Sequence, residues 1–147
     1  MKLKPLTPQD HPVYRHYFNN QRYPLCAYSL ASIIAWSNAE YKPYGAEVDG
    51  AFVVAAEFET ATHNRHLILP ISPVKDHTPG ELKDLAVKFG FETFWFVPED
   101  YINAYGKKRI HSFFTIQEQT GYNDYVYRTE DLTALKGNKY SKKRNLI

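Results

Sequence analysis

Basic side chains are concentrated at the C-terminal end of the chain, at the spacing of a phosphate-binding surface. Residues 136–147 contain five basic residues and no acidic one, while the rest of the chain carries 16 acidic residues against 13 of the 18 basic ones. In a helix, Lys139, Lys142 and Lys143 would share one face. Such clusters bind phosphate groups, and the binding weakens as salt is added. We therefore expect Lys139, Lys142, Lys143 and Arg144 to bind a polyanion, either a tRNA acceptor end or an anionic lipid headgroup; the alternative is a solvated charged terminus.

Tyrosines precede this basic segment at the spacing of one face of a strand. Tyr125 and Tyr127 alternate along residues 123–128, and Arg128 follows them. Aromatic faces beside a cation stack on nucleobases, so Tyr125, Tyr127 and Arg128 form a possible substrate groove, to which Tyr122 could add a further ring. Tyrosines that alternate along a strand are also common half-buried packing residues, so this alternative stays open.

The remaining histidines, the cysteine and a second basic run show no pattern of a catalytic or metal site. The only close histidine pairs are His63 with His66 and His11 with His16, and neither has the spacing of a helical zinc site, so we expect no metal. Cys26 is the single cysteine, cannot form an intrachain disulfide, and is expected to be a buried thiol. The basic run at residues 107–109 is expected in a loop.

Helices are expected over residues 8–18, 29–37, 78–89, 99–104 and 129–137. The third has the clearest signals, because Thr78-Pro79-Gly80-Glu81 is a capping box with proline at the first helical position. Gly90 is a typical helix stop. The helix would bury an apolar stripe made of Leu82, Leu85, Ala86 and Phe89.

Strands are expected over residues 44–48, 51–58, 66–71, 93–97, 112–117 and 123–128. Asp49-Gly50 predicts a tight hairpin between the first two. The continuous apolar run at 93–97 is typical of a strand covered on both faces, which we therefore expect at the centre of the sheet. Strand, helix and strand over residues 66–97 predict a right-handed unit with two neighbouring parallel strands.

This order of elements resembles the GNAT-like acyl-CoA N-acyltransferase fold, an α/β (α+β) fold with a mixed, twisted sheet flanked by helices. The length of 147 residues and an apolar fraction of 44% suit one domain, expected at residues 1–137. Residues 138–147 would begin a junction to a second domain, because they end on apolar residues without a stop signal. The N-terminus lacks the apolar stretch of a signal peptide, and no window is apolar enough for a membrane span, so we expect a cytoplasmic protein.

Two segments resemble the phosphatidylglycerol lysyltransferase C-terminal-domain family. They are YVYRTEDLTALKGNKYSKKRNLI at residues 125–147 and YPLCAYSLASIIAWSNAEYKPYGAEVDG at residues 23–50. The resemblance implies tandem GNAT-like domains related to the Fem-type aminoacyltransferases, of which this chain is similar to the N-terminal half. Its main partner would be a C-terminal GNAT-like domain of the same protein, and the basic junction would lie near the groove between the two domains.

The resemblance implies acyl or aminoacyl transfer, with acyl-CoA or aminoacyl-tRNA as the possible donor, and a first half that supports catalysis without being active alone. It identifies no catalytic residue. The place that matches the donor-phosphate loop, residues 77–80, has one glycine and a proline without an N–H, so an ordinary capped helix is the expectation there. Glu57 and Glu59 end a strand where such enzymes can place a general base, although an exposed strand end is the simpler expectation. Two further functions stay open, a stand-alone CoA-dependent N-acetyltransferase and a non-catalytic binding module for tRNA or anionic lipid.

Overall fold

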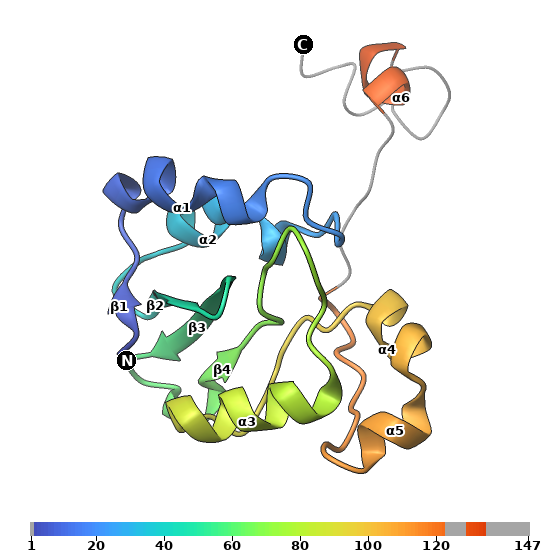
Figure 1. Cartoon of the computed structure of the whole chain (residues 1–147). Helices are drawn as coiled ribbons and strands as arrows, with labels where there is room; N and C mark the ends of the chain where they lie inside the picture. Colours follow the sequence, from blue (N-terminus) through green and yellow to red (C-terminus); the bar gives the residue numbers. More distant parts are fainter. Residues whose placement is uncertain (1, 123–128, 135–147) are drawn as a thin grey trace.

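The sheet of the molecule has four antiparallel strands. In a computed structural model that describes residues 2–122 and 129–134, they are β1 (Lys4–Pro5), β2 (Tyr41–Val48), β3 (Ala51–Phe58) and β4 (His66–Leu67), paired in the order β1-β2-β3-β4 (Figure 1). The predicted hairpin between β2 and β3 is confirmed, with Val48 opposite Ala51. Asp49 and Gly50 both have positive φ angles, 48° and 78°, as a two-residue hairpin turn requires.

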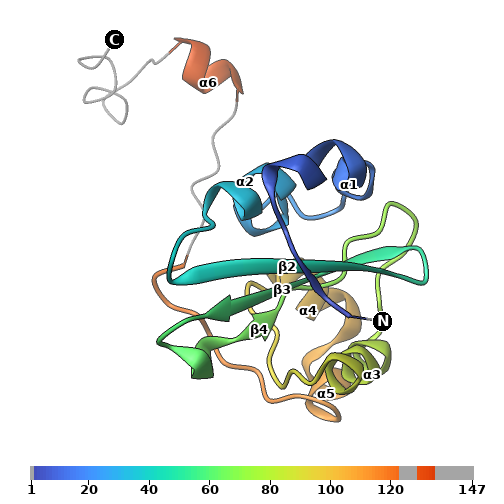
Figure 2. The ribbon, with the colours of Figure 1, turned by 90° about the vertical axis from the view of Figure 1, so that its left-hand side faces the viewer.

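Helices cover both faces of this sheet. Helices α1 (His11–Phe18) and α2 (Leu30–Ala35) lie on one face, and α3 (Pro79–Phe89) lies on the other (Figure 2). Helices α4 (Glu99–Tyr105) and α5 (Lys107–His111) follow on the side of α3, and the chain also contains α6 (Thr129–Ala134). The fold is therefore mixed α+β. No helix among the described residues is long and apolar enough to cross a bilayer.

Strand β3, rather than residues 93–97, is the strand buried on both faces. All residues from Ala51 to Ala56 are buried, and their side chains alternate between two apolar clusters. Phe52 and Val54 belong to the cluster beneath α1 and α2, whereas Val53 and Ala55 belong to the cluster that includes Leu85 of α3. The expectation that residues 93–97 form the central strand is wrong, because the apolar run at 93–97 pairs at one position only.

Helix α3 forms as the sequence predicts. The Thr78 hydroxyl accepts a hydrogen bond from the Glu81 amide at 3.3 Å, and the Glu81 carboxylate accepts one from the Thr78 amide at 2.7 Å. The helix ends at Gly90, which adopts the left-handed conformation with φ of 72°. Leu82, Leu85 and Ala86 are buried, as the apolar stripe requires.

The parallel pair on either side of α3 is present in a shortened form. Leu67 of β4 and Phe94 form an isolated parallel bridge, in which the Leu67 amide donates to Thr93 O at 3.0 Å and the Trp95 amide donates to Leu67 O at 2.9 Å. Beyond this bridge the two segments separate. Residues 68–71 continue along β3, through reciprocal bonds between Phe52 and Ile71, while the other segment turns away at Phe96.

The segment after α3 differs most from the sequence expectation. The short helix predicted at 99–104 is confirmed as α4, but residues 107–109 lie in α5 and not in a loop, and residues 112–117 form no strand. Gly106, with φ of 77°, ends α4 and begins α5 without the extended connection that a loop would need. The strand expected at 123–128 and the end of the last helix lie outside the described residues.

Candidate functional site

The polyanion and groove residues named from the sequence lie outside the part of the chain that the structure describes. They are Lys139, Lys142, Lys143, Arg144, Tyr125, Tyr127 and Arg128. Their roles therefore stay predictions. The structure instead brings together a different group of residues, at the edge of the sheet where β4 and residues 94–96 separate.

This group lines a cavity of about 230 Å³, which we call the edge cavity. Its walls come from the connection between α1 and α2, from α2, from β2 and β3, from β4, and from the segment after Phe94. None of the side chains that line it in the described part of the chain carries a formal charge at neutral pH. The lining residues are Cys26, Ala27, Ile33, Trp36, Tyr41, Val54, Ala56, Phe58, Asn64, His66, Ile68, Trp95, Phe96 and Tyr122.

Phe96 lies in the wall of the edge cavity, at a turn that leads the chain away from β4. Phe96 has a φ angle of 56°, in the left-handed region that non-glycine residues rarely adopt. Two hydrogen bonds hold its backbone there: its amide donates to Gln119 Oε1 at 2.7 Å, and its carbonyl accepts from Tyr28 Oη at 3.0 Å. Tyr28 is almost fully buried, so the turn is anchored in the core.

His66 is a buried polar side chain in the wall of the edge cavity. Its Nδ1 lies 2.7 Å from Asn64 O. A carbonyl oxygen only accepts hydrogen bonds, so Nδ1 carries the proton and Nε2 of the neutral ring carries a lone pair. Burial lowers the pKa of His66 to about 4, which keeps the ring neutral at pH 7. Nε2 of His66 is therefore an uncharged hydrogen-bond acceptor at pH 7.

Aromatic rings surround His66. Its imidazole stacks on the Trp95 indole, with 4.3 Å between ring centroids and 6° between ring planes, and meets the Phe96 ring edge-on at 5.7 Å. Tyr122 lies edge-on to both Trp95 and Phe96. Trp36, at the end of α2, stays 53% exposed, and Tyr122 stays 60% exposed. The arrangement provides flat apolar walls with two accessible rings.

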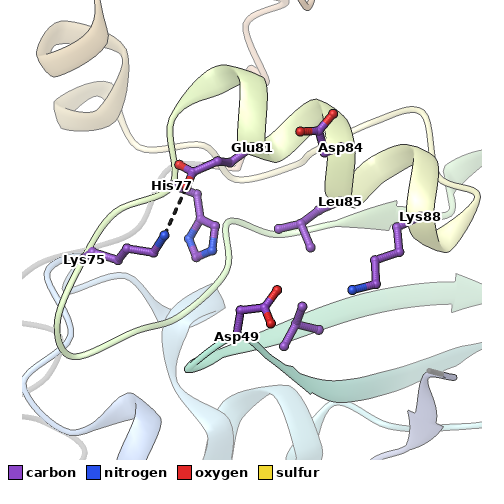
Figure 3. A pocket seen from close by; sticks show the side chains of 8 residues that line it. Asp49, Lys75, His77, Glu81, Asp84, Leu85 and Lys88 are labelled. Carbon is purple, nitrogen blue, oxygen red and sulfur yellow. Dashed lines mark hydrogen bonds and ion pairs between the residues drawn. The ribbon is translucent and has the colours of Figure 1, made fainter.

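A second hollow of about 220 Å³ lies between α3 and the turn that joins β2 to β3 (Figure 3). Its charged and polar walls include Asp49, Lys75, His77 and Lys88. The His77 imidazole points into it from the loop before α3. His77 is 7% exposed and its Nδ1 has no hydrogen-bond partner, while burial and the nearby Lys75 ammonium lower its pKa.

The start of α3 is not arranged to hold a phosphate. Pro79 has no amide hydrogen, and the Glu81 amide is already bonded to the Thr78 hydroxyl. The Glu81 carboxylate also occupies this end of the helix, where the Thr78 amide and the Lys75 ammonium lower its pKa to about 2. A negative group at that position would repel a pyrophosphate.

The other residues considered from the sequence lie in ordinary surroundings. Glu57 pairs with Arg65 at 3.3 Å and Glu59 pairs with Lys42 at 3.0 Å, both on exposed surface. No group of three or more histidine, cysteine, aspartate or glutamate side chains among the described residues could hold a metal ion. Cys26 is half-buried in the wall of the edge cavity.

Sequence reasoning missed most of the edge cavity. From the sequence, His66 is considered only as half of a possible metal pair, Trp95 and Phe96 belong to an expected central strand, and Trp36 is assigned no role. No spacing in the sequence links Trp36, His66 and the adjacent pair Trp95 and Phe96, since the three positions lie in separate parts of the fold. Tyr122 is the exception, because its position in a tyrosine-rich segment already suggested stacking.

Comparison of the chain with protein-family models, with curated proteins and with solved structures finds no match. The fold and the site therefore define the class of this protein at a general level. It has a mixed α+β fold, in which described residues with uncharged, largely aromatic side chains line a cavity beside a four-stranded antiparallel sheet.

Proposed function

We propose that this chain is the N-terminal half of a tandem GNAT-like acyl- or aminoacyl-transferase, which shapes the substrate groove and is not catalytic alone. One observation carries the proposal. Leu67 and Phe94 pair in parallel on either side of α3, at the edge of a sheet that is otherwise antiparallel. Such a pair with a single intervening helix is the element of the GNAT-like arrangement that an ordinary antiparallel sheet lacks.

The order of elements supports the same proposal. Two helices follow β1, three antiparallel strands come next, and α3 leads to the segment that pairs with β4. The edge cavity opens where β4 and this segment separate. A mostly apolar cavity at such an edge suits the side chain of an acyl group or of an acceptor.

The chemistry of the edge cavity favours a non-catalytic role for this chain over a catalytic one. A general base works best when its pKa lies near the working pH, whereas the pKa of His66 is about 4. Burial also raises the pKa of Tyr41, so its phenol stays protonated. Both groups are therefore neutral hydrogen-bonding partners at pH 7 and poor proton-transfer groups.

The proposal is tested by a transfer assay on two proteins, this chain and the full-length natural protein that carries it. Each is incubated with radiolabelled aminoacyl-tRNA or with acetyl-CoA, together with phosphatidylglycerol vesicles or a peptide amine as acceptor. We expect transfer by the full-length protein and none by the chain alone. Absence of transfer from every donor by the full-length protein would overturn the proposal.

A non-catalytic binding module is the second candidate, and the low pKa of His66, which makes this side chain a poor general base, favours it. Binding of tRNA or anionic vesicles without transfer by the full-length protein would establish this function instead. A stand-alone CoA-dependent N-acetyltransferase is disfavoured by the occupied amides at the start of α3. Turnover of acetyl-CoA by this chain alone would establish that third function.

A further inference from the structure

We propose that the edge cavity binds a planar, uncharged aromatic ring that carries an N–H or O–H donor. The role of such a ring, as part of the transferred group or of the acceptor, rests on the proposed function. The binding of such a ring does not rest on the proposed function, because it is inferred from the residues that line the edge cavity.

The size and walls of the edge cavity select a single flat ring. Its volume of about 230 Å³ lies below the range of about 300–1,000 Å³ that is usual for drug-sized ligands. An apolar cavity of roughly 150 Å³ already accommodates benzene. Because the described residues that line the cavity are uncharged, an ionic ligand would lose its hydration without gaining a charged partner among them.

Two accessible aromatic side chains border this cavity from separate elements. Trp36 ends α2 and Tyr122 follows Gly121, and both leave more than half of their surface exposed, at 53% and 60%. Large aromatic side chains are normally buried for most of their area, and contiguous exposed apolar surface marks binding sites. Because both residues line the cavity, a ring bound there would lie within reach of both.

His66 provides a hydrogen-bond acceptor that favours a ring with an N–H or O–H donor. Its Nδ1 proton is used by Asn64 O, so Nε2 is an acceptor that a ring N–H or O–H can reach from the cavity. His66 lines the cavity but is only 2% exposed, so a ligand would have to enter the cavity beside the Trp95 ring to contact it. The ring most complementary to the site therefore combines a flat face with a donor at its edge.

The strained turn at Phe96 is consistent with a preformed site. Its left-handed backbone is fixed by Tyr28 and Gln119, and it places the Phe96 ring in the wall of the cavity beside Trp95. Strained backbone is retained where the surrounding structure uses it, frequently at ligand sites.

The chain contains two tryptophans, Trp36 and Trp95, and both line the edge cavity. Tryptophan fluorescence of the whole chain therefore reports on binding. Phenol serves as a probe ring with an O–H donor and pyrrole as one with an N–H donor, benzene as a ring without a donor, and cyclohexanol as a donor without an aromatic ring. We expect a saturable response to phenol or pyrrole, and an affinity for cyclohexanol at least tenfold lower.

The variant His66→Phe keeps a flat side chain and removes the acceptor. We expect about a tenfold loss of affinity for the probe that binds, and less than a twofold change for benzene. The matched control is His16→Phe, because His16 also bonds a local carbonyl, Val13 O at 2.9 Å, but lies on exposed surface. This control should bind as the wild type does.

A third variant keeps the proposal testable if His66→Phe does not fold. Ala27→Phe adds a ring from the wall of the edge cavity, and it should abolish the response to the probes. Responses that do not saturate, or that are equal for phenol and cyclohexanol, would overturn the proposal. The absence of any fluorescence response to the probes would also overturn the proposal. This result is expected if another segment of the same chain fills the cavity. None of these measurements depends on transfer activity, so failure of the proposed function would be seen separately.

Discussion

The imidazole of His66 stacks on the indole of Trp95, with 4.3 Å between the ring centroids and 6° between the ring planes. This contact joins β4 to the segment that follows α3, next to the single parallel bridge between Leu67 and Phe94. It holds the sheet edge together at the point where the two segments separate. The edge cavity therefore depends on a neutral His66, since a protonated ring would be buried without a counter-charge.

Because His66 is buried in its neutral form, the free energy of unfolding should depend on pH. The pKa of His66 is about 4 in the folded protein and 6.5 ordinarily, so the unfolded chain binds the proton first as the pH falls. Stability is therefore fully present above pH 6.5 and is lost between pH 6.5 and about 4, by about 3 kcal/mol at most. Urea unfolding of His66→Phe should show a flatter profile than the wild type over this interval.

Other groups act in overlapping or lower pH ranges. The pKa of His77 is also lowered, so it contributes in the same direction in both proteins and cancels in the comparison. The lowered pKa of Glu81 removes stability only as the pH falls below 4.5. Parallel profiles for wild type and variant between pH 6.5 and 4.5 would show that His66 is not buried as described.

Close packing at Gly45 predicts a large effect of a single methyl group. A Cβ at this position would lie 2.5 Å from Phe52 Cζ and 2.9 Å from Leu6 Cδ2. The Phe52 ring is fully buried and packed 4.6 Å from the Tyr14 ring, so it has little room to move. We expect Gly45→Ala to lower the free energy of unfolding by about 1–3 kcal/mol in urea titrations.

Gly80→Ala in α3 is the matched control for this packing prediction. The nearest atom to its new Cβ would be Phe113 Cζ, at an ordinary distance of 3.6 Å. Alanine also restricts the unfolded chain, so we expect no loss and a gain of up to about 1 kcal/mol. Equal destabilisation by the two alanines would contradict the packing around Phe52.

The N-terminal cap of α3 predicts a smaller effect. Thr78→Ala removes the acceptor of the Glu81 amide and should cost about 1 kcal/mol of stability in urea or thermal unfolding. Thr78→Ser retains the hydroxyl and should stay within a few tenths of a kcal/mol of the wild type. If the serine and alanine variants lose the same stability, the hydroxyl does not cap this helix.

The elements that could be predicted from sequence are those with local signals. Thr78 to Gly90 carries both helix boundaries in its own residues, and Asp49-Gly50 specifies its hairpin through two positive φ angles. The prediction of a central strand at residues 93–97 was wrong because this segment lacks such a local signal. Its β-propensity is high, but its structure is decided by distant residues, because Tyr28 and Gln119 fix the turn at Phe96.

The edge cavity could not be predicted from the sequence because it also depends on contacts between residues that are distant in the chain. His66 and Trp95 are 29 positions apart, and Trp36 and Tyr122 reach the cavity from two further elements. No periodicity connects such residues. The basic residues were recognisable because their signal is composition, which needs no fold.

The basic end of the chain predicts salt-sensitive binding of polyanions. If Lys139, Lys142, Lys143 and Arg144 contact about four phosphates of single-stranded tRNA ends, the logarithm of affinity should fall with the logarithm of salt with a slope of about −3. Filter binding with the quadruple alanine variant should show almost no remaining slope. Anionic vesicles of phosphatidylglycerol test the lipid source in the same way.

Residues 107–109 provide the control for this prediction. Lys107, Lys108 and Arg109 form a second exposed basic cluster, in α5, so their triple alanine variant removes a similar charge elsewhere. Its affinity and salt slope should stay close to those of the wild type. An equal loss of affinity in both variants would mean that binding depends only on the net charge of the chain. The C-terminal basic residues would then not form a specific binding surface.

The central claim is that the edge cavity is part of the substrate groove of a transferase. The most direct test is the transfer rate of the full-length protein that carries Ala27→Phe, compared with Ala31→Phe on the exposed side of α2. We predict that Ala27→Phe lowers kcat/KM at least 100-fold without loss of folding, and that Ala31→Phe stays within twofold of the wild type. A folded Ala27→Phe protein that transfers as fast as the wild type would contradict the account.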